Sequence, residues 1–243
     1  LYDVFRNRII FPIKSHRDQI IGFGGRVIDP ADNPKYLNSS DSDIFKKGRE
    51  LYGLSEILKN KKRINRIVVV EGYTDVLSLF SNDMNYAVAT LGIATSKVHI
   101  DKLFTHVDEV IFCFDGDDAG VKAAESALNI SLSGLRDGKK IKFMFLPEGE
   151  DPSSLLEKEG KEEFEKRMEN SKVLSEYLFE NILKKYDDSI ESKASAMKEF
   201  LDIMQLMPSS NFKKIMFQEF SKKLGVELEE IKQPERQKKL DVR

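Results

Sequence analysis

The sequence predicts an α/β fold built on a mostly parallel sheet, and two observations carry this prediction. Strand-sized apolar runs alternate with helical stretches from about residue 51 to residue 146. The runs at 67–70 and 110–114 have no polar residue on either face, which is typical of strands that helices cover on both sides. This alternation indicates βαβ units with right-handed crossovers around a four-stranded core.

A strand-rich, basic segment precedes this core. Residues 8–13 and 19–28 have the strand pattern of a hairpin around a polar turn, and a polar, turn-rich loop follows at 32–40. The glycines within 22–25 fit neither dinucleotide-binding nor phosphate-loop spacing, so we expect close backbone packing there. Residues 1–63 hold 13 Lys and Arg against 8 Asp and Glu, which suits either a path for a polyanion or an ordinary solvated surface.

The remaining elements follow in order along the chain. After a helix at 51–62, strands are expected at 67–70, 86–90, 109–114 and 141–146, with helices between them at 76–80, 95–103 and 119–132. Beyond residue 147 the composition shifts to charged helices, four or five of them between 153 and 232, which predicts a helical bundle. We therefore expect a truncated, strand-rich basic subdomain at 1–47, a metal-binding catalytic α/β domain at 48–152, and a helical bundle at 153–243.

Acidic residues stand where two of the predicted strands end. Glu71 follows one strand and Asp75 lies in the first turn of the next helix, while Asp115 and Asp117 follow a second strand. The carboxyl ends of neighbouring parallel strands meet at one edge of a sheet, so these side chains should share a crevice. Clustered carboxylates repel one another unless a divalent cation neutralises them. Oxygen ligands without nearby His or Cys indicate Mg²⁺ or Mn²⁺ rather than zinc.

Composition excludes several classes of protein. A hydrophobic share of 40% with 33% charged residues is typical of a soluble globular protein. No apolar run has the length of a membrane-spanning helix, so we expect no membrane partner, and the single cysteine of the chain fits a reducing cytoplasm. The single Cys113 excludes a disulfide framework and a multi-cysteine zinc site, and His16, His99 and His106 lack the spacing of zinc ligands or a catalytic triad. The chain starts without Met and reads as a fragment of a longer protein.

The acidic cluster alone leaves several functions open. A two-aspartate phosphatase of the haloacid-dehalogenase type would need Thr or Val two residues after Asp117, where Ala119 stands. A receiver-like regulatory domain could hold Mg²⁺ without turnover. Neither reading explains the basic strands that precede the cluster. A metal-dependent nuclease or nicking enzyme remains possible, because it needs only the ions and water.

The motifs Glu71-Gly72-Tyr73-Thr74-Asp75 and Asp115-Gly116-Asp117 resemble the Toprim signature shared by primases, topoisomerases and some nucleases. Several flanking segments resemble, in order, the RNA polymerase domain of the bacterial DnaG-type replicative primase. This resemblance runs from Leu1 to about Met168. The segments that carry it are at residues 5–8, 11–13, 21–26, 34–39, 45–48, 51–54 and 145–152.

The resemblance implies a Toprim parallel sheet flanked by helices and an enzyme, a nucleotidyltransferase that makes RNA primers on single-stranded DNA during replication. It implies two or three Mg²⁺ or Mn²⁺ ions and no zinc in this fragment, with catalysis by Glu71, Asp115 and Asp117. The metal ligands would be Glu71, Asp75, Asp115, Asp117 and Asp151. The residues that match family contacts to nucleotide, primer or template are Arg26, Lys35, Tyr36, Asn38 and Lys47.

The partners implied are a single-stranded DNA template, ribonucleoside triphosphates and an RNA–DNA hybrid at the bacterial replication fork. The replicative helicase and single-strand-binding protein are expected to act through regions absent here, as is the family's zinc module. One departure concerns the metal site. Ser153 stands where the family commonly has a second Asp after Asp151-Pro152, which puts the outermost metal position in doubt. The alternative function is a metal-dependent Toprim nuclease or nicking enzyme.

Overall fold

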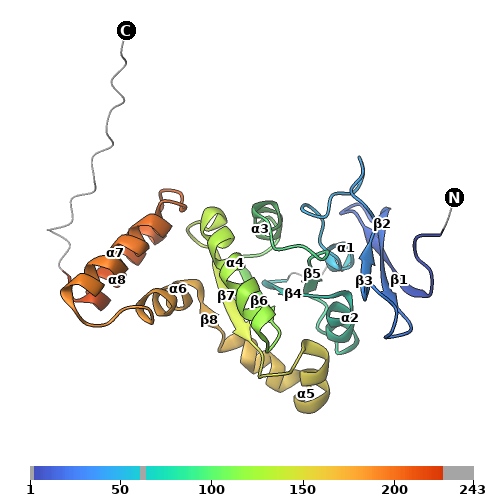
Figure 1. Cartoon of the computed structure of the whole chain (residues 1–243). Helices are drawn as coiled ribbons and strands as arrows, with labels where there is room; N and C mark the ends of the chain where they lie inside the picture. The colour runs from blue at the N-terminus through green and yellow to red at the C-terminus, as the bar shows by residue number, and fades with distance from the viewer. Residues whose placement is uncertain (1–2, 61–63, 227–243) are drawn as a thin grey trace, which may run out of the picture.

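The computed structural model of the 243-residue chain describes residues 3–60 and 64–226. A small sheet lies at one end, a larger sheet lies in the middle, and α7 and α8 lie at the other end (Figure 1). No helix among the described residues is both long and apolar enough to cross a bilayer.

The small sheet is antiparallel and is formed, in order, by β1 (Arg8–Lys14), β2 (Ile20–Val27) and β3 (Tyr36–Asn38). The expected hairpin is β1 and β2, whose turn is closed where the N–H of Ser15 donates to the carbonyl of Gln19. Gly24 packs as closely as the sequence suggested. A Cβ at this position would lie 2.5 Å from the ring of Tyr73, which begins α2 (Tyr73–Ser81), so only glycine lets the small sheet approach that helix so closely.

The larger sheet has the strand order β5-β4-β6-β7-β8. The first four strands are parallel, which confirms the predicted α/β class. A fifth strand, which the sequence did not predict, pairs antiparallel with β7 and consists of only two residues. The strands are β4 (Arg66–Val70), β5 (Ala87–Ala89), β6 (Glu109–Phe114), β7 (Lys140–Phe145) and β8 (Lys172–Val173).

Helices cover both faces of this sheet. The helices that follow its strands are α2 (Tyr73–Ser81), α3 (Lys97–Phe104), α4 (Asp118–Gly134) and α5 (Pro152–Glu169). Alternate residues of β4 enter different cores: Ile67 and Val69 face one cluster, and Val68 and Val70 face the other. All four are at most 4% exposed, as the two-sided apolar pattern predicted.

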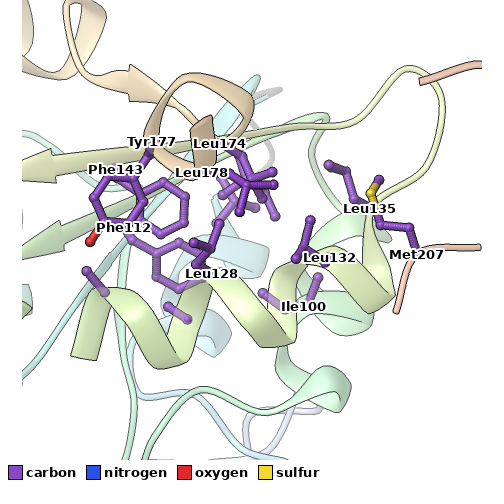
Figure 2. Packing of buried hydrophobic residues seen from close by; sticks show 14 of the residues in the cluster. Ile100, Phe112, Leu128, Leu132, Leu135, Phe143, Leu174, Tyr177, Leu178 and Met207 are labelled. Carbon is purple, nitrogen blue, oxygen red and sulfur yellow. The ribbon is translucent and has the colours of Figure 1, made fainter. Parts of the chain in front are cut away.

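The larger core joins the sheet to the C-terminal helices. Figure 2 shows Phe112 and Phe143 of the sheet beside Tyr177 of α6, with Leu128 of α4 closing the cluster. The rings of Phe143 and Tyr177 stack with their centroids 4.9 Å apart. After α5, the helices in the described part of the chain are α6 (Leu174–Leu183), α7 (Ile190–Met204) and α8 (Asn211–Leu224).

The first helix of the central region is shorter than predicted. It was expected over 51–62, but α1 spans Leu54–Lys59. Residues 61–63 lie outside the described residues. At its start, the backbone of Tyr52 exchanges two hydrogen bonds with Ala89 at the edge of the sheet, and Gly53 turns the chain at a φ of 86°. Tertiary pairing therefore replaces the first helical turn that the apolar spacing suggested.

Candidate acidic active site

The structure brings Glu71 and Asp115 together at the carboxyl edge of the sheet. Glu71 directly follows β4 and Asp115 directly follows β6, and these strands are neighbours that pair in parallel. The backbone N–H of Asp115 donates to Oε1 of Glu71 at 3.4 Å. These two carboxylates therefore come from adjacent strands and lie close together, as the strand pattern predicts.

Burial and mutual repulsion raise the pKa values of three of the predicted acids, which favours their protonated forms. Burial, reinforced by the neighbouring carboxylates of Glu71, Asp75, Asp151 and Asp117, raises the pKa of Asp115 to about 7. Burial also raises the pKa of Asp75 to about 6, although the N–H of Gly72 and the charge of Arg26 oppose it. The pKa of Glu71 is raised by the same desolvation, against the N–H of Asp115. All five predicted ligands thus share one electrostatic neighbourhood.

The donor set fits a hard divalent cation. Oδ1 of Asp115 is buried and has no hydrogen-bond partner in the described part of the chain, although buried carboxylate oxygens are usually paired. A cation would satisfy this oxygen and offset the repulsion. Over residues 3–60 and 64–226, however, no three or more acidic, His or Cys side chains already surround a point that a metal ion could occupy.

Three of the five acids also cap helices. Asp75 Oδ2 accepts from the N–H of Gly72 at 2.9 Å, Asp117 Oδ1 accepts from Gly120 at 2.7 Å, and Asp151 Oδ1 accepts from Ser154 at 2.7 Å. Each bond commits one carboxylate oxygen to a helix N-terminus and fixes the orientation of the side chain. Each second oxygen has no hydrogen bond to a described residue, and it is the atom that a ligand could use.

Two backbone hydrogen bonds clamp the loop of Asp151 against the loop of Asp115. The N–H of Gly116 donates to the carbonyl of Glu150, and the N–H of Gly149 donates to the carbonyl of Gly116, both at 3.0 Å. A Cβ on Gly116 would lie 1.8 Å from the carbonyl oxygen of Pro147. The two loops can therefore approach this closely only with glycine at position 116, because any side chain would collide with the backbone of Pro147.

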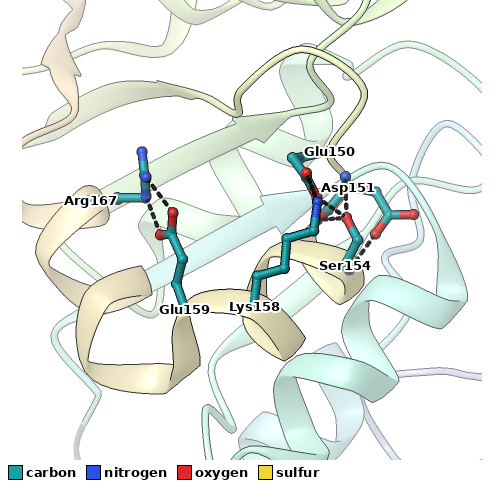
Figure 3. Close-up of polar contacts among 6 residues, drawn as sticks. All are labelled: Glu150, Asp151, Ser154, Lys158, Glu159 and Arg167. Atoms are coloured by element: carbon teal, nitrogen blue, oxygen red, sulfur yellow. Dashed lines mark hydrogen bonds and ion pairs between the residues drawn. The ribbon is translucent and has the colours of Figure 1, made fainter.

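Polar contacts at the start of α5 hold Asp151 in place. Figure 3 shows Asp151 at the helix start beside Glu150, whose carboxylate contacts Ser154 and Lys158. The hydroxyl of Ser153, the residue that replaces the family's usual Asp, is 3.1 Å from the hydroxyl of Ser78 on α2. Ser153 is therefore engaged with α2, and the acids of this loop are Glu148, Glu150 and Asp151.

Arg26 and Tyr36 lie opposite each other on β2 and β3. The Arg26 guanidinium and the Lys35 ammonium each lie 5.8 Å from the centroid of the Tyr36 ring, a cation–π distance. The charge of Arg26 opposes the rise in the pKa of Asp75, so it reaches the acidic cluster. Within the described residues, neither cation has a carboxylate within 4.0 Å. Both remain unneutralised beside the site.

Asn38 connects the small sheet to the acidic site. Its Oδ1 accepts from the hydroxyl of Tyr73, and its Nδ2 donates to the carbonyl of Leu91 at 2.9 Å. Tyr73 stacks on Phe11 with ring centroids 5.1 Å apart and meets the edge of Tyr52. Each polar atom of the Asn38 amide thus makes one bond to the protein and keeps a second N–H or lone pair for the predicted nucleotide or nucleic-acid contact.

Beside Glu71 lies a pocket of about 330 Å³ between the strand ends and residues 92–95. Its apolar floor includes Val69, Phe112 and Phe114, and Thr90 and Thr95 add hydroxyl groups. Lys47 is part of the segment that packs against this loop, because a Cβ on Gly48 would lie 3.8 Å from Ile93. Of the predicted contact residues, Arg26 lies on β2, Tyr36 and Asn38 lie on β3, Lys35 directly precedes β3, and Lys47 lies in the segment after Phe45.

Sequence reasoning missed the structural role of His99. The residue is fully buried, its Nδ1 accepts from the N–H of Ser96, and its Nε2 lies 3.2 Å from the carbonyl oxygen of Lys47. The signal was present as Ser96-x-x-His99 at a helix start, the spacing at which the third helical residue accepts a hydrogen bond from the backbone N–H of the N-cap residue.

We expect the protonation of His99 to destabilise the fold in mild acid. Burial, together with the charge of Lys102, lowers the pKa of His99 to about 4, while the carbonyls of Lys47 and Glu50 oppose this. Between pH 6.5 and 4 the unfolded chain binds a proton that the folded chain does not, so stability falls with falling pH. The free energy of unfolding should drop by about 3 kcal/mol from this group between pH 7 and 4.

Urea unfolding at several pH values checks this, with His99→Gln as the comparison. Because glutamine does not titrate, the difference in unfolding free energy between wild type and His99→Gln should shrink as the pH falls from 6.5 to 4. A difference that stays constant across this range would show that His99 does not titrate as its burial suggests.

Three family models match the chain. The DNA primase catalytic core N-terminal domain matches residues 1–58, a Toprim-like domain matches 68–156, and the DnaB-helicase binding domain of primase matches 175–229. The third match lies inside this chain, so the expectation that the helicase-binding region is absent was wrong. This match also extends the resemblance well beyond residue 168, its expected end.

Known proteins agree with these models. The chain is 46% identical over 226 residues to a DNA primase of Escherichia coli K12, covering 93% of this chain and 39% of that protein. A structure of the DnaG catalytic core matches with a TM-score of 0.89 and 46% identity, over 93% of this chain and 73% of that one. A DnaG primase catalytic domain bound to single-stranded DNA matches with a TM-score of 0.85 and 45% identity, over 91% and 71%. The chain thus spans about two fifths of the curated relative's length.

Proposed function

Because the chain belongs to the family of DnaG-type DNA primases, within their catalytic core, we propose that it carries out nucleotidyl transfer to make short RNA primers on single-stranded DNA. One observation carries the proposal. The carboxylates that follow β4 and β6 lie near the unneutralised Arg26 of the small sheet, whose charge opposes the rise in the pKa of Asp75. This is an arrangement for metal ions and a polyphosphate together.

Metal dependence is a property of the Toprim domain and of the primase family. We propose that the ions are two or three Mg²⁺ or Mn²⁺, because the donors are carboxylates only. When bound, the ions would neutralise the triphosphate and lower the pKa of the attacking 3′-hydroxyl. The proposed ligands are Glu71, Asp75, Asp115, Asp117 and Asp151, with catalysis assigned to Glu71, Asp115 and Asp117.

The chain's own residues would bind and orient the nucleic acid and the nucleotide. Arg26, Lys35 and Lys47 offer charge to phosphates, and the Tyr36 ring, flanked by Arg26 and Lys35, offers a stacking surface. Asn38, which also holds β3 against Tyr73 and Leu91, would offer its remaining N–H and oxygen lone pair to the nucleotide or nucleic acid. The proposed substrates are ribonucleoside triphosphates and an RNA–DNA hybrid on a single-stranded template.

Residues 175–229 and the bacterial relatives suggest a wider context. We propose that the helices from α6 onward take part in binding the replicative helicase, and that the protein works in the bacterial cytoplasm at the replication fork. Contact with single-strand-binding protein is the remaining partner proposed from the family. The proposed division at 1–47, 48–152 and 153–243 places the helicase contact in the third part.

One incubation tests the activity against its alternative. The chain is mixed with single-stranded DNA, labelled ribonucleotides and Mg²⁺ or Mn²⁺, once with bare template and once with a preformed RNA primer. Labelled oligoribonucleotides or extended primers support the proposal. Shortened DNA without ribonucleotide incorporation would instead identify a nuclease or nicking enzyme, and no reaction in either arm would contradict both.

Lys35→Ala should weaken nucleic-acid binding and reduce its salt dependence. Lys35 is exposed and has no carboxylate partner within the described chain, so its ammonium group is free to displace a counterion from a phosphate. Fluorescence anisotropy with labelled single-stranded DNA should give a log–log salt slope lower by about 0.7. The control is Lys222→Ala on α8, far along the chain in the bundle. Equal slopes for Lys35→Ala and wild type would make Lys35 an ordinary surface charge.

A further inference from the structure

A buried histidine outside the acidic cluster is bonded to the backbone of one proposed phosphate-binding lysine. Nδ1 of His99 accepts from the N–H of Ser96 at 3.2 Å, so the proton of the neutral ring is on Nε2. Nε2 therefore donates to the carbonyl oxygen of Lys47 at 3.2 Å. Both ring nitrogens are therefore hydrogen-bonded: Nδ1 to Ser96 at the start of α3, and Nε2 to the backbone of Lys47.

Ser96 supplies a second tether to the same segment. Its hydroxyl donates to the carbonyl of Gly48 at 2.7 Å and accepts from the N–H of His99 at 3.1 Å. Two consecutive carbonyls, those of Lys47 and Gly48, are thus fixed by the start of α3. On the other side, the N–H of Lys47 donates to Asp41 at 3.1 Å. The backbone on both sides of the Lys47 side chain is therefore held.

The tethered segment lies next to one wall of the pocket beside Glu71. Gly48 lies against Ile93, and Ile93 and Glu71 both line that pocket. Within residues 3–60 and 64–226, no carboxylate lies within 4.0 Å of the Lys47 ammonium, although the residue is half-buried. A half-buried cation without an anion beside a site for polyphosphate is positioned for a ligand that the protein itself does not supply.

We propose that His99 is a positioning residue, which with Ser96 fixes the backbone of Lys47 so that the lysine binds the triphosphate of the incoming nucleotide. The inference rests on the proposed function and deepens it. A lysine side chain has several rotatable bonds, and holding its backbone removes part of the ordering cost that nucleotide binding would otherwise incur. Loss of the tether should therefore weaken nucleotide binding more than it slows the chemical step.

Two substitutions of His99 separate the tether from the helix cap. In His99→Asn the side-chain oxygen replaces Nδ1 as the acceptor for Ser96, but the side chain is too short to reach Lys47. In His99→Gln the amide N–H can take the place of Nε2–H. In primer extension, His99→Asn should raise the KM for nucleoside triphosphate about tenfold and leave kcat within about twofold, and His99→Gln should restore most of the KM.

A double-mutant cycle with Lys47→Ala decides whether His99 acts through the lysine. In the Lys47→Ala background, His99→Asn should cause little further rise in KM, because its target is gone. A tenfold rise that persists there would show a general structural role and overturn the inference. So would an unchanged KM in His99→Asn alone, or a loss confined to kcat.

The matched control is His106→Asn, the same substitution at an exposed position after α3, which should leave KM unchanged. Thermal unfolding of each variant confirms that the fold is retained. If wild type extends no primer, the proposed function fails, and equilibrium binding of ATP with Mg²⁺ then tests His99 separately. Equal ATP affinity of wild type and His99→Asn would overturn the inference independently.

Discussion

Glu71→Gln should abolish primer synthesis while leaving the fold intact. The change removes one negative charge at the centre of the acidic cluster and keeps an oxygen that can accept from the N–H of Asp115. Loss of a carboxylate ligand removes several kcal/mol of charge stabilisation, so the rate should fall by at least about 10²-fold. Steady-state incorporation of labelled ribonucleotides at saturating Mg²⁺ or Mn²⁺ measures this.

The stability of this variant separates function from folding. Glu71, Asp75 and Asp115 repel one another without a cation, so removal of one charge should leave the unfolding temperature equal or higher. The control is Glu109→Gln, at the start of β6 and therefore at the opposite edge of the sheet, which should keep full activity. Wild-type rates in Glu71→Gln would remove Glu71 from the mechanism, and a lower unfolding temperature would mean that its charge supports the fold.

Gly116→Ala should also abolish activity, by displacing two loops at once. The added methyl group would stand 1.8 Å from the carbonyl oxygen of Pro147, which is backbone and cannot rotate away. Either Asp115 and Asp117 move, or the loop before Asp151 does, and both mutual hydrogen bonds of Gly116 are strained. A misplacement of about 1 Å can cost on the order of 10²-fold in rate. The variant should also lose thermal stability, in contrast to Glu71→Gln.

Gly138→Ala is the matched control for this prediction. Gly138 has a φ of 83° but no atom within 4 Å of an added Cβ, so alanine there meets backbone strain of about 1 kcal/mol without a collision. It should lower the unfolding temperature modestly and leave the rate unchanged. If Gly116→Ala behaves like Gly138→Ala, the clamp between the two acidic loops is not required for catalysis.

The sequence was sufficient to predict the α/β class because its apolar runs match two-sided burial. Residues 67–70 read as a fully covered strand, and alternate residues of β4 do enter two separate cores. The meeting of Glu71 and Asp115 followed from strand polarity alone. By contrast, β8 contains only Lys172 and Val173, too few residues for a period to be visible, and it exists because β7 offers an open edge.

Side-chain partners across the fold were beyond sequence patterns. Asn38 reads as an exposed loop residue suited to a ligand, yet its amide is bonded to Tyr73 and Leu91, which are distant in sequence. His99 has no ligand spacing, and its tether to Lys47 joins residues 52 positions apart. Capping and tethering depend on which elements become neighbours, and the pattern of one segment does not record that.

The packing around Tyr73 limits how this site can be transplanted. The Tyr73 ring stacks on Phe11 and lies against Gly24, and its hydroxyl donates to Asn38. Each strand of the small sheet therefore contributes one residue that contacts this tyrosine of α2. A graft of residues 1–47 onto a distant relative would carry the cations across but would need the host to supply that tyrosine. A junction between residues 47 and 48 would also separate Lys47 from Gly48, whose carbonyls are bonded to His99 and Ser96 at the start of α3. An exchange that keeps the site intact must therefore include the small sheet together with Tyr73 and the start of α3. A chimera joined at the proposed domain boundary should lose nucleotide binding before it loses its fold.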